Sequence, residues 1–135
     1  YRERRLISFD LTNGTVSWKS ESQYLTHPAL SEGEVFAATN SPLRLESLSE
    51  ETGELNWSWV PQDSAVTSFH RNIIATNTHI FVSSNNGIHA ISRINHKEEW
   101  FYPVAGTLSL SANKILYIAE GYRKSNGVLH AINLK

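Results

Sequence analysis

The chain repeats one short pattern about every forty residues. A small residue, a large apolar residue and a polar residue recur four times, with the polar member at Asp10, Ser49, Ser92 and Asn133, at intervals of 39, 43 and 41 residues. In the first three copies a tryptophan follows the polar residue by 8 positions, at Trp18, Trp57 and Trp100. A fixed period of about 40–45 residues is typical of a propeller blade or a helical solenoid.

The residues within each copy favour strands over helices. The runs Val35–Ala38, Ile80–Val82 and Ile115–Ile118 are short, rich in β-branched and aromatic residues, and flanked by Gly or Asn. This is strand chemistry, and no window carries the apolar stripe of a long amphipathic helix. Four short antiparallel strands in each copy predict a β-propeller blade.

The expected fold class is all-β, an arc of about three four-stranded antiparallel blades from a β-propeller. The arc fills residues 1–135, and its blade parts are 6–20, 27–60, 67–102 and 107–134. The first part holds two expected strands and the last holds three, whereas natural propellers have 4–8 complete blades. We therefore expect either the remaining blades of a parent ring or further copies of this chain, as a homo-oligomer, to cover the two end faces.

A tight turn precedes each tryptophan. It reads Thr12-Asn13-Gly14 in the first copy and Glu51-Thr52-Gly53 in the second, and a glycine there supplies a positive φ. The third copy has Asn95-His96 instead, and we expect Asn95 to take the left-handed conformation. The polar residue should bind the turn, and the indole should bury on the order of 200 Å² against the neighbouring blade. The expected docking residues are Asp10, Gly14, Trp18, Ser49, Gly53, Trp57, Ser92 and Trp100.

The segments 6–18 and 47–57 resemble the tryptophan docking motif of the pyrroloquinoline-quinone (PQQ) repeat family, and 90–100 keeps its spacing without the Thr-Gly. The resemblance implies a propeller and a periplasmic or other extracytoplasmic location. The family includes quinoprotein dehydrogenases and also non-catalytic scaffolds of the outer-membrane assembly lipoprotein type. Its dehydrogenases often use adjacent cysteines against the quinone and carboxylates around a calcium ion.

Composition excludes several classes of function. With 12 Lys+Arg against 13 Asp+Glu the net charge is −1, so the basic stripe of a nucleic-acid binder is missing. No apolar run approaches the roughly 18 residues of a membrane-spanning helix. The chain has no Cys, which removes thiol catalysis and Cys-ligated zinc, and its 6 His lack zinc-binding spacing. We expect no catalytic, cofactor-binding or metal-binding residue.

Two places remain as candidate contact sites for a protein partner. The lengthened hairpin 121–127 carries Tyr122, Arg123 and Lys124, an aromatic and cationic group. Trp59 lies two residues after Trp57 on the same strand face, either as further packing or as part of an exposed patch.

The sequence thus predicts a non-catalytic propeller segment that acts as a scaffold or binding module and is not an enzyme. The alternative is a fragment of a PQQ-dependent alcohol or sugar dehydrogenase, which would need PQQ with calcium.

Overall fold

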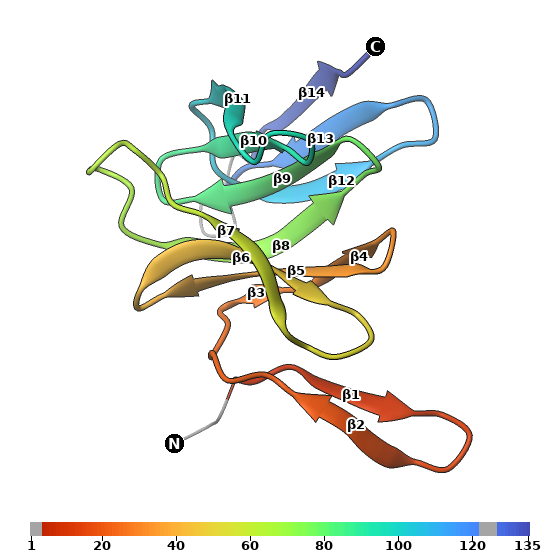
Figure 1. Cartoon of the computed structure of the whole chain (residues 1–135). Helices are drawn as coiled ribbons and strands as arrows, with labels where there is room; N and C mark the ends of the chain where they lie inside the picture. The colour runs from red at the N-terminus through yellow and green to blue at the C-terminus, as the bar shows by residue number, and fades with distance from the viewer. Residues whose placement is uncertain (1–3, 122–126) are drawn as a thin grey trace.

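The computed structural model describes residues 4–121 and 127–135, which form strands joined by turns and loops (Figure 1). The strands, in chain order, are β1 (Ile7–Asp10), β2 (Thr15–Lys19), β3 (Thr26–His27), β4 (Ala29–Ser31), β5 (Glu34–Asn40), β6 (Leu43–Ser49), β7 (Leu55–Trp59), β8 (Phe69–Ala75), β9 (His79–Ser84), β10 (Ile88–Ser92), β11 (Glu98–Tyr102), β12 (Thr107–Leu110), β13 (Ile115–Ala119) and β14 (Leu129–Asn133).

The strands form four sheets, which we number as blades. Blade 1 is β1-β2, blade 2 is β4-β5-β6-β7, blade 3 is β8-β9-β10-β11 and blade 4 is β12-β13-β14. Within every blade neighbouring strands are antiparallel. In Figure 1 blade 1 lies at the bottom, blade 2 lies above it, and blades 3 and 4 share the upper part. The all-β arc of antiparallel blades is therefore confirmed.

Residues 4–121 and 127–135 contain one strand that the sequence did not predict. The short strand β3, which precedes blade 2 in the chain, pairs in parallel with β8 of blade 3, through Thr26 with Arg71 and His27 with Asn72. Repeat spacing does not reveal this pairing, because it joins the start of the second copy to a strand of the third.

The core lies between the blades, because the central strands bury both faces. All five residues of β10 are buried, as are five of the six in β9. Blades 2 and 3 enclose the first apolar cluster, and blades 3 and 4 enclose the second. A third cluster joins blade 1 to blade 2 and has fewer buried residues: Tyr24, Val35, Ala37 and Leu48, with Leu6 and Trp18 against them.

Asparagine amides tie the inner strands of neighbouring blades together. The side chain of Asn40 exchanges hydrogen bonds with the backbone of Phe69, at 2.8 and 3.2 Å. Asn72 does the same with Leu108 of the next blade, at 2.8 and 3.0 Å. Each amide imitates a strand-to-strand pairing across a junction where the two sheets are separate, and so fixes the register between blades.

Candidate functional site

Side chains that bear chemistry gather at the junctions between blades, and each tight turn sets the geometry of a junction. Gly14 and Gly53 have φ of 70° and 74°, and the same position in blade 3 is taken by His96 with φ of 59°. The left-handed residue of the third turn is thus His96, and the expectation that Asn95 would adopt it was wrong. The polar residue before each turn binds it: Asp10 Oδ1 accepts from the Thr12 backbone and hydroxyl at 2.8 and 2.6 Å.

At the junction of blades 1 and 2 the indole of Trp18 lies on Gly53. A Cβ at Gly53 would come within 2.5 Å of the ring, so the indole occupies the space that a side chain would need. Trp18 Nε1 donates to the carbonyl oxygen of Glu50 at 2.8 Å. The tryptophan of one copy is therefore held by the turn of the next copy, through its backbone.

At the junction of blades 2 and 3 the partner of the indole is a ring. Trp57 stacks on His96, with ring centroids 4.1 Å apart and planes 7° apart. Its Nε1 donates to Glu34 Oε1 at 3.0 Å. The carboxylate of Glu34 also accepts from the Ser47 hydroxyl at 2.6 Å and pairs with the guanidinium of Arg93 from blade 3.

The side chain of Arg93 also crosses this junction, from blade 3 to blade 2. Only 8% of it is exposed, and it donates to Ser31 Oγ at 2.8 Å and to the carbonyl oxygen of Thr76 at 2.6 Å. Its guanidinium also lies 5.1 Å from the ring centre of Phe36. Burial raises the pKa of Glu34, but the hydrogen bonds from Ser47, Arg93 and Trp57 outweigh it, so that the pKa is lowered overall.

Trp59 is buried, with 8% of its surface exposed, and packs at 6.1 Å from Phe69 and 5.3 Å from His89. Of the two alternatives expected for Trp59, the structure shows packing, and Trp59 is not part of an exposed patch. Trp57 is less buried than Trp59. Trp59 is a buried member of the cluster between blades 2 and 3, and Trp57 packs against that cluster.

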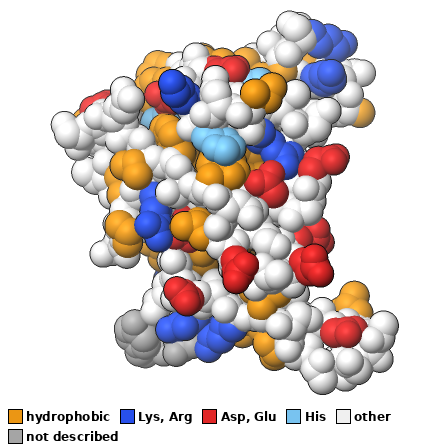
Figure 2. Space-filling model, in the orientation of Figure 1, with side chains coloured by type: hydrophobic (Ala, Val, Ile, Leu, Met, Phe, Trp, Pro, Cys, Tyr) orange, Lys and Arg blue, Asp and Glu red, His pale blue; other side chains and the backbone are white. Residues whose placement is uncertain are grey.

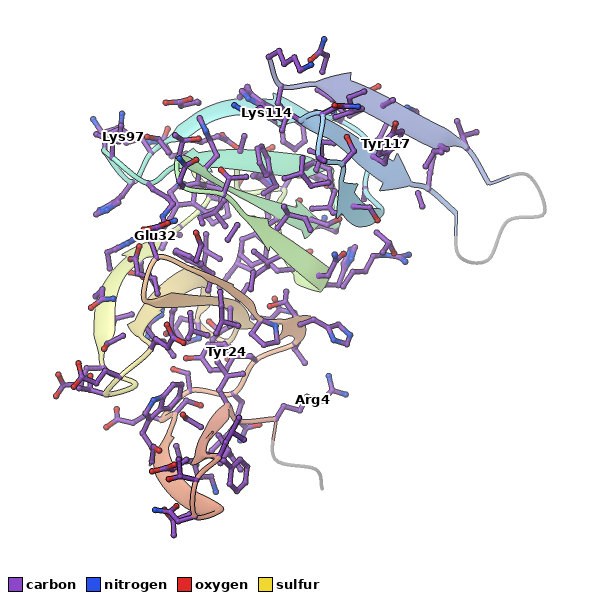
Figure 3. All side chains as sticks on the ribbon, turned by 90° about the vertical axis from the view of Figure 1, so that its right-hand side faces the viewer. Arg4, Tyr24, Glu32, Lys97, Lys114 and Tyr117 are labelled. Carbon is purple, nitrogen blue, oxygen red and sulfur yellow. The ribbon has the colours of Figure 1, made fainter. Side chains whose placement is uncertain are left out.

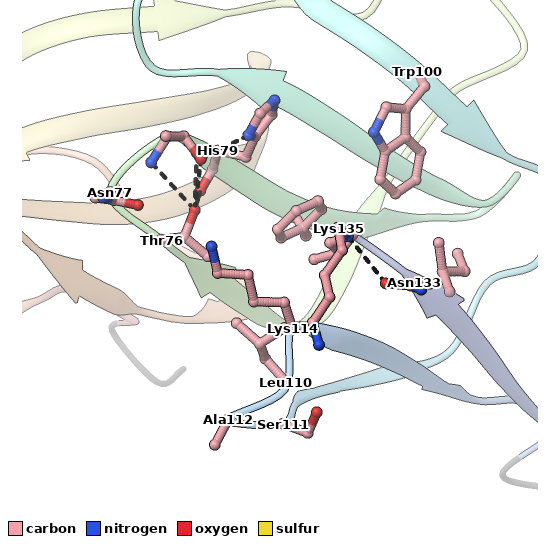
Figure 4. A pocket seen from close by; sticks show the side chains of 14 residues that line it. Thr76, Asn77, His79, Trp100, Leu110, Ser111, Ala112, Lys114, Asn133 and Lys135 are labelled. Carbon is pink, nitrogen blue, oxygen red and sulfur yellow. Dashed lines mark hydrogen bonds between the residues drawn. The ribbon is translucent and has the colours of Figure 1, made fainter.

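Trp100 lines a cavity of about 520 Å³ between blades 3 and 4 (Figure 4). Phe81, Leu110 and Ile132 supply further apolar walls, and His79 and Lys114 lie among the polar lining residues. Asn133 Oδ1 accepts a hydrogen bond from the backbone nitrogen of Lys135, two residues later, at 3.0 Å. Asp10 Oδ1 accepts from the backbone nitrogen of Thr12 in the same way. No hydrogen bond joins Trp100 Nε1 to another residue within the described ranges 4–121 and 127–135, unlike the indoles of Trp18 and Trp57.

Blade 2 contains a buried carboxylate, Glu46 of β6, which binds the segment that connects blade 1 to blade 2. Glu46 is 2% exposed and accepts from Tyr24 Oη at 2.6 Å, from Arg44 Nε at 2.8 Å and from Ser22 Oγ at 3.2 Å. Burial and the hydrogen bond to Glu46 raise the pKa of the Tyr24 phenol. Figure 3 shows Tyr24 between the blade 1 hairpin and blade 2. A phenol that keeps its proton in this way serves as a fixed donor and is unsuited to proton transfer.

Ser84, His89 and Glu98 form a chain of hydrogen bonds that resembles the catalytic triad of a hydrolase. His89 Nε2 lies 2.8 Å from Ser84 Oγ, and Nδ1 hydrogen-bonds Glu98. A nucleophile must reach a substrate, however, and Ser84 is fully buried with its hydroxyl oxygen accepting from the backbone nitrogens of Asn86 and Gly87 at 3.2 and 3.3 Å. The arrangement closes the β9–β10 hairpin and clamps β11 onto it.

Two further histidines form pairs with glutamates. His79 pairs with Glu99 and His130 with Glu120, the latter at 3.0 Å. Burial, followed by the charge of Arg71, lowers the pKa of His70 at the inner edge. Among residues 4–121 and 127–135, no three His, Asp or Glu side chains are grouped as metal ligands would be.

The face shown in Figure 2 carries both acidic and basic side chains and is not dominated by one sign of charge. The candidate contacts Tyr122, Arg123 and Lys124 lie outside the described residues. In the described part of the chain, no helix has the length and apolarity needed to cross a bilayer.

Sequence reasoning missed the residues that cross the junctions by side chain. Glu34 and Arg93 are 59 residues apart and hold the same network, yet neither belongs to the repeated pattern. The only sign of them in the sequence was that each is a charged residue at a position where the repeated pattern does not specify the residue type. His96 carried a clearer one, because it stands where the other copies have Gly.

Comparison with solved structures supports the fold. BamB from Moraxella catarrhalis matches with a TM-score of 0.73 and 21% identity over 98% of this chain and 41% of that one. A europium-containing methanol dehydrogenase matches at 0.63 and 14% identity, over 85% and 24%. Hsv2 from Kluyvelomyces marxianus matches at 0.61 and 12%, over 97% and 42%. The chain thus spans less than half the length of each of these structures.

No curated protein sequence matches the chain. The family model described as outer membrane protein assembly factor BamB matches residues 1–116, which is most of the chain. That match covers the first three tryptophan repeats and the start of the fourth blade, and the PQQ-type propeller repeat expected from the sequence is confirmed by it. The chain therefore belongs to the family of the outer membrane protein assembly factor BamB.

Proposed function

We propose that this chain is a non-catalytic, protein-binding segment of a β-propeller that serves outer-membrane protein assembly at the periplasmic face of the membrane. The observation that carries the proposal is the use of its reactive side chains. Ser84 and His89 look like catalytic residues, but they are buried and engaged in holding strands together. The match to the family of an outer membrane protein assembly factor supports the setting that we propose.

The junction contacts support a scaffold because they make the blades rigid. Arg93, Asn40 and Asn72 each join one blade to the next with a pair or more of hydrogen bonds. A rigid arc presents its loops and outer strands at fixed positions, and binding surfaces on a rigid scaffold lose less conformational entropy on association.

The rival function is a segment of a PQQ-dependent dehydrogenase, and one experiment distinguishes the two. The whole protein is titrated with PQQ and calcium while tryptophan emission is followed, and alcohol-dependent dye reduction is measured in parallel. We expect neither saturable binding at micromolar PQQ nor dye reduction. Saturation together with dye reduction would overturn the proposal.

The binding half of the proposal is tested by photo-crosslinking in cells. A photoreactive residue replaces Val60 or Ile94, whose side chains are 57% and 87% exposed. The matched control replaces Val82, which is fully buried. We expect crosslinks from the exposed positions to a component of the outer-membrane assembly machinery and none from the control. If neither exposed position, nor others along the outer strands, captures such a component, the scaffold is not part of that machinery.

A further inference from the structure

The described residues contain two Asn-Gly pairs, and both close hairpins. Asn13-Gly14 joins β1 to β2, and Asn86-Gly87 joins β9 to β10. An Asn-Gly pair is reactive because glycine has no side chain to keep its backbone nitrogen away from the asparagine side-chain carbon. The structure gives the two pairs very different surroundings.

Asn13 lies at an exposed hairpin tip. Its Oδ1 accepts from the Thr15 backbone nitrogen at 2.9 Å and from Thr15 Oγ1 at 2.7 Å. These two hydrogen bonds draw electron density from the side-chain carbonyl and hold it alongside the peptide of Gly14. A Cβ placed on Gly14 would meet nothing within 4 Å, so this peptide has room to rotate.

Asn86 is held in a packed hairpin. Gly87 is buried, and a Cβ there would lie 2.2 Å from the carbonyl oxygen of Tyr102 and 2.8 Å from the ring of Phe101. The amide oxygen of Asn86 accepts from Asn85 Nδ2 at 2.9 Å, and the backbone nitrogen of Gly87 donates to Ser84 Oγ. Rotation of this peptide would require the neighbouring strand β11 to move.

We propose that Asn13 is a site of spontaneous covalent modification, by deamidation, and that the folded chain protects Asn86. The backbone nitrogen of Gly14 loses its proton and bonds to Cγ of Asn13, while the Cγ–Nδ2 bond breaks and the amide leaves as ammonia. Water then opens the cyclic imide at either carbonyl, giving aspartate or isoaspartate. The hydrogen bond from Gly14 to the carbonyl oxygen of Asp10, 2.7 Å long, must open first, so the rate follows opening of the hairpin tip.

The product changes the turn at the position where a propeller repeat receives an indole. Asn13 Nδ2 now donates to Asp10 Oδ2 at 3.4 Å, and a carboxylate in its place would face Asp10 with like charge. Hydrogen bonds from Thr12 lower the pKa of Asp10, so that carboxyl is ionised at neutral pH. Isoaspartate also adds a backbone atom to the turn. At Gly53, which is the counterpart of Gly14 in the next blade, the indole of Trp18 leaves no room for an added atom.

The test is a timed incubation of the whole chain at mildly alkaline pH, with peptide mapping by mass spectrometry and enzymatic isoaspartate detection. We expect the amide-to-acid change at Asn13 to run roughly tenfold or more ahead of that at Asn86, because the exposed tip opens more easily. In concentrated denaturant the two rates should converge. Equal rates in the folded chain, or a faster change at Asn86, would overturn the proposal.

Two variants separate the chemistry from an effect on folding. Asn13→Gln keeps the amide but moves its carbon out of reach of Gly14 N, and should abolish the change at this position while Asn86 is unaffected. Thr15→Val keeps a β-branched residue in β2 but removes one donor to Asn13 Oδ1, and should slow the change. Thermal unfolding of each variant checks that the fold is retained, and modification of Asn13→Gln at the parent rate contradicts the mechanism.

Discussion

The junction between blades 1 and 2 and the junction between blades 2 and 3 solve the same packing problem with different chemistry. Each places an indole on the residue with positive φ in the turn of the following blade. In the first, Trp18 rests on Gly53 and donates to a backbone carbonyl. In the second, Trp57 rests on the ring of His96 and donates to the side chain of Glu34.

The difference shows how a repeat can vary its contacts and keep its geometry. A glycine turn recognises the indole by shape, because the ring fills the space of the missing Cβ. A histidine turn offers a ring as the contact surface, and the second junction adds the Glu34–Arg93 pair. Together with its larger apolar cluster, this makes the junction of blades 2 and 3 the more strongly bonded one.

The largest expected effect is at Trp59. Trp59→Ala should lower the free energy of unfolding by about 3–5 kcal/mol, since it removes a buried ring from the cluster between blades 2 and 3. Trp18→Ala at the other junction should cost less, because Trp18 is only partly buried. Chemical denaturation of both variants measures this difference, and equal midpoints would mean that the two junctions are equally strong.

Glu34→Gln comes next. It removes the charge that pairs with the buried Arg93, and we expect a loss of about 2–3 kcal/mol, below the full cost of breaking a wholly buried pair because Glu34 is partly exposed. Glu32→Gln, two residues away and exposed, is the matched control and should change little. A cost for Glu34→Gln no larger than the control would remove the ion pair from the account of this junction.

The same variant should alter the response to acid. The pKa of Glu34 is lowered in the folded chain, so its stabilising contribution is present above the ordinary value of 4.5 and is lost as pH falls through the lowered value. Between neutral pH and pH 3, the free energy of unfolding should therefore fall less for Glu34→Gln than for the parent chain. Chemical denaturation at a series of pH values measures this difference.

The next comparison is between the same substitution at the two glycine turns, where the expected difference in stability is smaller. Gly53→Ala should cost about 2–3 kcal/mol, from the left-handed backbone and from contact of the new methyl with Trp18. Gly14→Ala meets the same backbone strain but no contact, and should cost about 1 kcal/mol. If the two costs agree, the indole does not constrain the turn at Gly53.

The smallest effect is expected at His96. His96→Gly removes the stack with Trp57 but relieves the positive φ, so the two changes should nearly cancel, within about 1 kcal/mol. Trp57 emission should change clearly although stability does not. A large loss of stability would show that the ring stack, rather than the backbone of the turn, holds this junction.

The sequence was sufficient for the blades because their period and strand chemistry are local properties. The positions of the turns and the tryptophans followed from the spacing of the copies alone. The burial of Trp59 did not follow, because alternation along β7 places Trp57 and Trp59 on one face without saying how deep each lies. The Glu34–Arg93 pair was also beyond reach, since it depends on how one blade is rotated against the next.

Strand β3 has a consequence for what counts as a separable module. Residues Thr26 and His27 stand at the start of the second copy in the sequence, yet their strand pairing belongs to the sheet of the third. Thr26 Oγ1 also accepts a hydrogen bond from the backbone nitrogen of Ala38 in the second copy, so β3 binds both blades. A blade cut out by the repeat period, or duplicated by it, would leave one edge of blade 3 without its pairing strand, and β3 would keep only its contacts with β5. A segment that keeps both sets of β3 contacts must therefore contain blades 2 and 3 together and include Thr26.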